Sequence, residues 1–154
     1  IKKITKMCRQ AGVICGIHSC GKERYVVEAC AEETELDYLN PLERPPMGDC
    51  DLAECKEKFG NKLALMGNLH TTDVMLFGTV DDVRLESLRA IRSAGASGGF
   101  VLSTGDECGR DTPFENILET LRTAKEFGTY PLDFQKIEEE ISRLEKKKKR
   151  NPEE

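Results

Sequence analysis

Three side chains that can bind a metal ion follow two apolar segments of the chain. His18 and Cys20 are two residues apart, so on an extended backbone both side chains project to the same side. Cys108 comes much later, after another apolar segment. Imidazole and thiolate are preferred zinc ligands, and three protein ligands with an open fourth position are typical of a catalytic zinc site. Spacing alone also allows a plainer interpretation, in which His18 is a hydrogen-bonded residue at a strand end.

Other polar side chains follow apolar segments in the same way. Asn40 and Glu43 follow the second segment, Asn68 and His70 the third, and Glu107 the fourth. In parallel α/β folds, functional groups collect in the loops beyond the carboxyl ends of the strands. We therefore expect Asn40, Glu43 and Asn68 to bind a cofactor, and His70 and Glu107 to take part in catalysis. A hydrogen-bonded loop histidine is the plainer interpretation of His70.

The elements that must position these residues alternate between strand and helix. Short apolar runs that end in polar or glycine-containing turns predict strands at residues 12–17, 36–39, 63–66 and 99–103. Helical spacing and end signals predict helices after each strand, the clearest being 52–59 before Gly60, one capped by Thr79 and running to Gly95, and one opened by Thr112-Pro113.

This alternation predicts a parallel sheet with right-handed crossovers, as an open sheet or as a segment of a barrel. No Gly-x-Gly-x-x-Gly or Walker-type loop opens a helix, which argues against a nucleotide-binding open sheet. After Pro131, apolar residues among many charges predict an amphipathic helix whose stripe, Ile137, Ile141 and Leu144, needs a partner. We therefore divide the chain into residues 1–131 and a charged helical tail, 132–154.

Composition excludes several classes of protein. The 154 residues carry a net charge of −5, which argues against a general nucleic-acid-binding protein. No apolar run reaches the roughly 18 residues that a membrane-spanning helix needs. The chain shows no secretory signal, so we expect a cytoplasmic protein.

Seven cysteines form an odd set, so a disulfide framework explains them poorly. Cys8, Cys15, Cys30 and Cys55 occupy predicted helix faces or apolar runs, and we expect them to pack in the interior. Cys50 lies in a polar Gly-Asp-Cys-Asp stretch, which predicts an exposed or half-exposed loop thiol.

Several short motifs, in this order and spacing, resemble the carboxyl-terminal half of the uroporphyrinogen decarboxylase superfamily. The resemblance runs from about Met7 to about Pro131. Its motifs are His18-Ser19-Cys20-Gly21, Asn40-Pro41-Leu42-Glu43, Met66-Gly67-Asn68-Leu69, Gly78-Thr79 before Asp82-Val83, and Cys108-Gly109 leading into Thr112-Pro113-Phe114-Glu115-Asn116. It implies the second half of a (β/α)₈ barrel whose active site lies at the carboxyl-end mouth.

The resemblance implies one of two reactions. One is cofactor-free decarboxylation of uroporphyrinogen, and the other is zinc- and corrinoid-dependent methyl transfer, as in methylcobamide:coenzyme M methyltransferases. The decarboxylase pattern Gly-His-Gly in the last loop is Glu107-Cys108-Gly109 here, and His70 stands where that branch tends to have Asp. These differences, with His18-x-Cys20, favour the zinc branch. The resemblance implies His18, Cys20 and Cys108 as zinc ligands, with Asp106 or Glu107 orienting His18.

The resemblance implies a module that moves a methyl group from a methylated corrinoid, held by a carrier protein, to a thiol or reduced folate. The alternatives are a decarboxylase-type fragment and a catalytically silent subunit that binds a tetrapyrrole. Because such a barrel needs eight strands and this chain supplies four, we expect its amino-terminal half in a longer polypeptide, a separate partner or a second copy in a homodimer.

Overall fold

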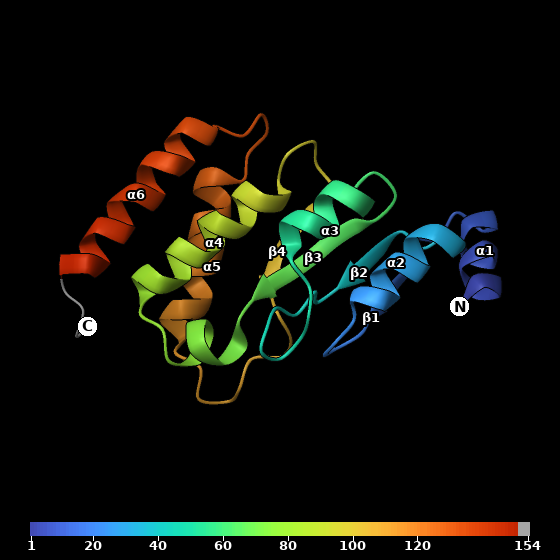
Figure 1. Cartoon of the computed structure of the whole chain (residues 1–154), viewed down its shortest axis with the longest axis horizontal. Coiled ribbons are helices and arrows are strands. Elements are labelled where there is room, and N and C mark those ends of the chain that lie inside the picture. The colour runs from blue at the N-terminus through green and yellow to red at the C-terminus, as the bar shows by residue number, and fades with distance from the viewer. Residues whose placement is uncertain (151–154) are drawn as a thin grey trace.

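Four short parallel strands alternate with helices along the chain (Figure 1). The computed structural model describes residues 1–150. In chain order the elements are α1 (Lys2–Gln10), β1 (Gly16–His18), α2 (Arg24–Glu33), β2 (Tyr38–Asn40), α3 (Leu52–Phe59), β3 (Ala64–Leu69), the π-helical η1 (Thr71–Leu76), α4 (Val80–Ala94), β4 (Phe100–Thr104), α5 (Phe114–Phe127) and α6 (Phe134–Arg150). The predicted fold class is therefore confirmed.

The strands form one sheet in the order β1-β2-β3-β4, and every pair is parallel. His18 lies opposite Asn40, and Asn68 lies opposite Ser103. A sheet whose order follows the chain, with no reversal, is a segment of a barrel rather than a doubly wound open sheet. The carboxyl ends of all four strands therefore share one edge, the mouth of the half-barrel.

One face of the sheet packs against helices, and the other is uncovered. Leu39 and Leu65 are fully buried in the core beneath α2 and α3, whereas Tyr38 and Val101 are exposed. Side chains alternate between the two faces along a strand, so the exposed residues line the inner face. On that face the Tyr38 ring covers Gly16, where an added Cβ would lie 2.0 Å from the ring.

Local capping fixes two of the predicted helices. The Thr79 hydroxyl accepts a hydrogen bond from the backbone N–H of Asp82, and the Asp82 carboxylate accepts one from the backbone N–H of Thr79, which completes a capping box at the start of α4. The Asp51 carboxylate accepts a hydrogen bond from the backbone N–H of Glu54 at 2.8 Å and so caps α3. Both helices span the predicted residues.

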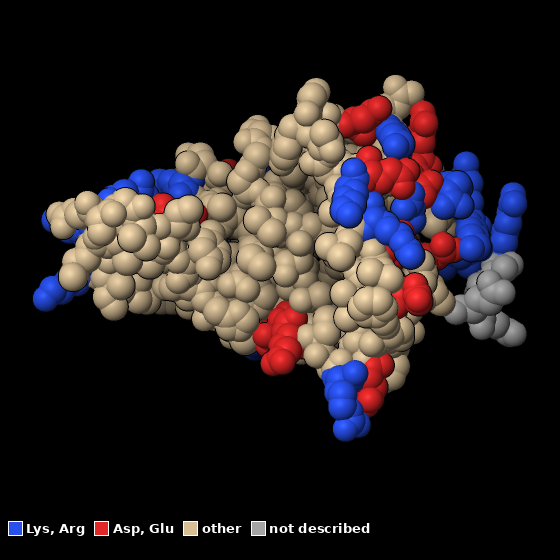
Figure 2. Space-filling view, turned by 180° about the vertical axis from the view of Figure 1, so that it is seen from behind, with Lys and Arg blue, Asp and Glu red and all other residues tan. Residues whose placement is uncertain are grey.

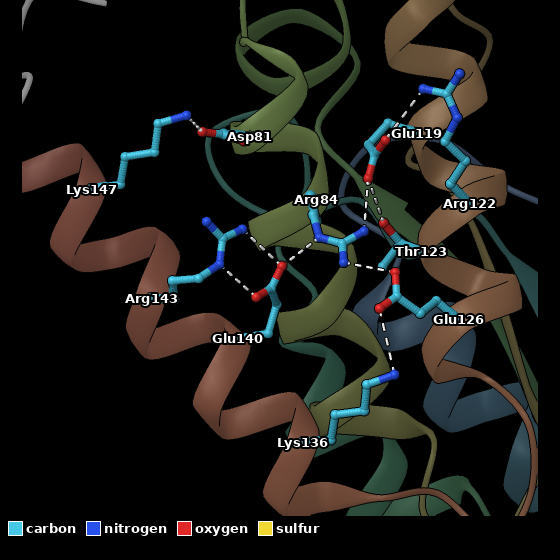
Figure 3. A network of polar contacts seen from close by, with 10 residues as sticks. All are labelled: Asp81, Arg84, Glu119, Arg122, Thr123, Glu126, Lys136, Glu140, Arg143 and Lys147. Carbon is cyan, nitrogen blue, oxygen red and sulfur yellow. Dashed lines mark hydrogen bonds and ion pairs between the residues drawn. The ribbon is translucent and has the colours of Figure 1, made fainter.

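The helical tail does not project freely. Ile137, Ile141 and Leu144 are buried against Leu85 and Leu88 of α4, so the predicted apolar stripe finds its partner within the chain. Ion pairs around Arg84 join α6 to α4 and α5 (Figure 3). The end of the predicted tail, 151–154, lies outside the described residues.

Both edges of the half-barrel carry exposed apolar side chains. Within residues 1–150, β1 and β4 each have a neighbouring strand on one side only. Beside β4, Phe114 and Leu121 of α5 are exposed, and before β1, Ile4 and Met7 of α1 are exposed. Seen from behind, charged side chains gather toward α6, while the middle of the molecule carries few (Figure 2). Among residues 1–150, no helix is both long enough and apolar enough to cross a membrane.

The prediction for Cys50 is wrong. Its side chain is buried, with only 1% exposed, beside Cys55 in the core beneath α2 and α3. The backbone N–H of Cys50 donates to the carbonyl of Glu43 at 3.0 Å, so the polar stretch turns back and carries the thiol inward. The polar neighbours of Cys50 in sequence could not reveal this turn.

Candidate metal-binding site

Three potential ligands converge at the mouth of the half-barrel. Nε2 of His18 lies 3.0 Å from Sγ of Cys20 and 3.3 Å from Oδ1 of Asp106, and the three donor atoms all lie within 4.8 Å of one another. His18 and Cys20 are exposed, and Asp106 is half-exposed. β1 and β4 are the two edge strands, so the sheet curls enough to bring the loop after β4 across the mouth to His18.

The loop after β1 holds Cys20 through backbone contacts. The N–H of Ser19 donates to the carbonyl of Asn40 at 2.9 Å, which extends the pairing of β1 with β2 by one residue. The N–H of Gly21 donates to the carboxylate of Glu43, and Gly21 has a φ of +82°, a conformation that favours glycine. Cys20 is therefore fixed from both sides.

The loop after β4 positions Asp106 in a similar way. The N–H of Gly105 donates to the carbonyl of Leu69 at 2.6 Å, so the loop continues the pairing of β4 with β3. The Thr104 hydroxyl donates to the carbonyl of Asp106 at 2.7 Å. Asp106 is thus presented to the mouth by a loop that is tied to the sheet.

Asp106 affects the protonation of the Cys20 thiol. The backbone N–H of Glu107, the Cys20 thiol and nearby His18 all lower the pKa of the Asp106 carboxyl. In turn, the hydrogen bond to the Asp106 carboxylate raises the pKa of the Cys20 thiol to about 11. Without a metal ion, the Cys20 thiol therefore keeps its proton and donates a hydrogen bond to the ionised Asp106 carboxylate.

Asn40 orients the imidazole from its other side. The side-chain Nδ2 of Asn40 lies 3.2 Å from Nδ1 of His18, which leaves Nε2 directed at Cys20 and Asp106. An amide can offer either its NH₂ group or its oxygen to the ring, so Asn40 can support either tautomer of His18. The sequence predicted that Asn40 binds a cofactor, and the structure places its side chain against His18.

Glu43 contacts the loop of Cys20 but is not one of the converging ligands, and Glu23 holds it in place. Glu43 is buried, and its backbone N–H donates to Oε1 of Glu23 at 2.9 Å. Glu23 is fully buried, its Oε2 has no partner among the described residues, and burial raises the pKa of its carboxyl to about 7. Sequence reasoning missed Glu23, because a glutamate at the start of a helix is an ordinary surface residue in most proteins.

Cys108 does not belong to the converging group. Its half-buried thiol lies beside the hydroxyl groups of Thr104 and Thr112 and packs against the cluster that contains Leu69 and Val74. Burial raises the pKa of this thiol, while the two hydroxyl groups oppose that shift. The structure thus joins His18 and Cys20, as predicted, but places Asp106 where the resemblance implied Cys108.

The other predicted residues also lie outside the converging group. Asn68 is buried and donates to the carbonyl of Leu42 at 3.0 Å. His70 is buried at the start of η1, where its Nδ1 accepts a hydrogen bond from the N–H of Asp73 at 2.9 Å. Its Nε2 lies 3.8 Å from the Asp73 carboxylate and has no hydrogen-bond partner among the described residues. The Glu107 side chain is exposed. Asn68 and His70 therefore stabilise the β3 end of the mouth.

The comparison with solved structures finds a similar fold in a methyltransferase from Methanosarcina mazei. The match has a TM-score of 0.66 at 22% sequence identity, and it covers 82% of this chain but 35% of the methyltransferase. The chain thus spans about a third of that protein. A search of curated proteins finds no match. Residues 1–127, most of the chain, match the family described as uroporphyrinogen decarboxylase (URO-D), and the protein belongs to that family.

Proposed function

We propose that this chain is the metal-binding part of a zinc-dependent methyltransferase that transfers a methyl group from a methylated corrinoid to a thiol or reduced folate. The observation that carries the proposal is the convergence of His18 and Cys20 with a carboxylate at the mouth of the half-barrel. The methyltransferase with a similar fold supports the same reaction class.

The residues at the mouth fit a zinc ion. Imidazole nitrogen, thiolate sulfur and carboxylate oxygen are the three kinds of protein ligand that zinc takes. The chemistry that zinc supplies in such a site is ionisation of an acceptor thiol at neutral pH, which makes the thiol a nucleophile.

The chain's own residues would bind, orient and expose the reacting groups. His18 and Cys20 would hold the ion, and Asn40 would keep the imidazole directed at it. Glu43 would hold the Cys20 loop through the N–H of Gly21. Because His18 and Cys20 are exposed, a corrinoid, which is a large macrocycle, could reach them while bound to a separate carrier protein.

The reaction would need more of the barrel than this chain provides. We propose that four further strand-helix units complete it, in a longer polypeptide, a separate partner or a second copy of this chain. The half-paired edges β1 and β4 and the exposed Val101, Phe114 and Leu121 support this proposal. Burial of such side chains is the main driving force for association.

Decarboxylation of a tetrapyrrole is the second candidate, and the family match itself favours it. That reaction needs no metal, so zinc binding separates the two candidates.

The test is metal analysis followed by activity. The purified chain should bind one zinc ion, and His18→Ala and Cys20→Ser should each abolish binding, whereas Cys8→Ser on α1 should not. Methyl transfer from methylcobalamin to a small thiol is then followed, with the chain in a completed barrel, by the absorbance change of the corrinoid. A folded chain that binds no zinc, or one that turns over a porphyrinogen instead, would contradict the methyltransferase proposal.

A further inference from the structure

We infer that Asp106, rather than Cys108, is the third protein ligand of the metal site, which gives a donor set of one imidazole, one thiolate and one carboxylate. This inference rests on the proposed function, because it assumes that a metal binds at His18 and Cys20. It departs from the two-thiolate site that the resemblance implied.

The first argument is the distance between donor atoms. Neighbouring donor atoms in a tetrahedral zinc site lie about 3.5 Å apart, as expected from zinc–ligand bonds of about 2.0 to 2.3 Å. Oδ1 of Asp106 lies 3.3 Å from Nε2 of His18, and Sγ of Cys20 lies 3.0 Å from that nitrogen. Small adjustments therefore suffice for these three atoms to share one ion.

The second argument is that the loop after β4 is built to present Asp106. Its backbone is tied to β3 through Gly105 and to the side chain of Thr104. The backbone N–H of Glu107 also interacts with the Asp106 carboxylate. A carboxylate held by such hydrogen bonds loses little conformational freedom when it binds a metal.

The third argument is the position of Cys108. Its half-buried side chain packs against the cluster that contains Leu69 and Val74, and its thiol lies beside the hydroxyl groups of Thr104 and Thr112. It is not among the donor atoms that converge with His18, so it would have to leave these contacts to join the site. Cys20, by contrast, is already in contact with both other ligands.

The donor set has a chemical consequence. Carboxylate oxygen is a harder and less electron-donating ligand than thiolate sulfur. A metal held by His18, Cys20 and Asp106 keeps more Lewis acidity than one held by two thiolates. Such a site should therefore favour harder divalent ions more than a two-thiolate site does.

The test compares Asp106→Asn with Cys108→Ser in the full chain. Zinc affinity is measured by competition with a chromophoric chelator, and the zinc-edge X-ray absorption spectrum gives the number of sulfur ligands. We expect one sulfur ligand in the wild-type chain. Asp106→Asn should weaken zinc binding by about tenfold or more, whereas Cys108→Ser should leave it nearly unchanged.

A third variant guards against misfolding. Asp106→Cys should retain zinc and raise the number of sulfur ligands to two, which is possible only if residue 106 faces the metal. Two sulfurs in the wild-type spectrum, with loss of zinc in Cys108→Ser, would overturn the inference and leave the proposed function standing. A folded wild-type chain without zinc would overturn both. Zinc bound through Asp106, in a completed barrel that transfers no methyl group, would overturn the proposed function alone.

Discussion

Asn40 and His18 face each other across the β1–β2 pair, and their side chains meet at 3.2 Å between Nδ2 and Nδ1. The contact needs no loop, because parallel register alone places the two residues side by side. It determines which ring nitrogen of His18 points at Cys20 and Asp106. A strand residue therefore orients a ligand that acts at the mouth.

Asn40→Ala should weaken zinc binding by about tenfold, because loss of a residue that orients a metal-bound histidine typically costs 10- to 100-fold in affinity. The chain should remain folded, since Asn40 is only partly buried. Chelator competition measures the affinity, and Asn61→Ala, at an exposed position after α3, is the matched control. Equal affinities of the two variants would show that Asn40 does not orient His18.

Glu23 should make the stability of the chain depend on pH. Its pKa is about 7 in the folded protein, against an ordinary value of 4.5. Between pH 4.5 and pH 7 the folded chain binds more protons than the unfolded chain, so the free energy of unfolding falls as the pH rises. The free energy of unfolding should fall by about 3 kcal/mol across this window, with almost no loss below pH 4.5 and the full loss above pH 7.

Urea unfolding of the wild type and of Glu23→Gln from pH 4 to pH 8 measures this effect. The Gln side chain stays neutral and can still accept from the N–H of Glu43, so the variant should lose the pH dependence in that window. Glu28→Gln, at an exposed position on α2, should behave like the wild type. If the free energy of unfolding depends on pH in the same way in the wild type and in Glu23→Gln, the pKa of Glu23 is not raised in the folded chain.

Arg84 anchors α6 to the rest of the molecule (Figure 3). Its guanidinium lies 3.0 Å from Glu119, 2.7 Å from Glu126 and 2.6 Å from Glu140, and it stacks on the Phe127 ring at 5.1 Å. These partners come from α5 and α6, so one side chain of α4 joins three helices.

Arg84→Met should lower the free energy of unfolding by about 2 to 4 kcal/mol, because it leaves the buried carboxylate of Glu119 without its closest partner. Adding Glu119→Gln should recover part of the loss. Arg110→Ala removes an ion pair whose arginine is 91% exposed, and it should change stability by less than about 0.5 kcal/mol. Equal effects of the Arg84 and Arg110 variants would mean that the network contributes no more than a surface pair.

Gly16→Ala should destabilise the chain by about 1 to 3 kcal/mol, because the new methyl group would overlap the ring of Tyr38. The double variant with Tyr38→Ala should remove the overlap, so the effect of the alanine at position 16 should be much smaller in that background. Chemical denaturation of the four proteins in this cycle measures the coupling. Additive effects would show that overlap with the Tyr38 ring does not cause the loss of stability.

The sequence by itself determined those features that depend on neighbours along the chain. Apolar runs and turn residues predicted four strands, and Thr79 predicted the start of α4, because caps and strand ends form within a few residues. The pairing of His18 with Cys20 is local in the same sense, since two residues separate them. The motifs pointed to the family that the comparison then showed.

Only the tertiary structure decided contacts that cross the mouth or the core. Asp106 and Cys108 are both polar loop residues after β4, and the curl of the sheet and the turn at Gly105 determine that Asp106 reaches His18. The burial of Cys50 and Glu23 likewise depends on how the loop after β2 folds back on α2. Such contacts join residues far apart in sequence, so their geometry follows from packing and not from spacing along the chain.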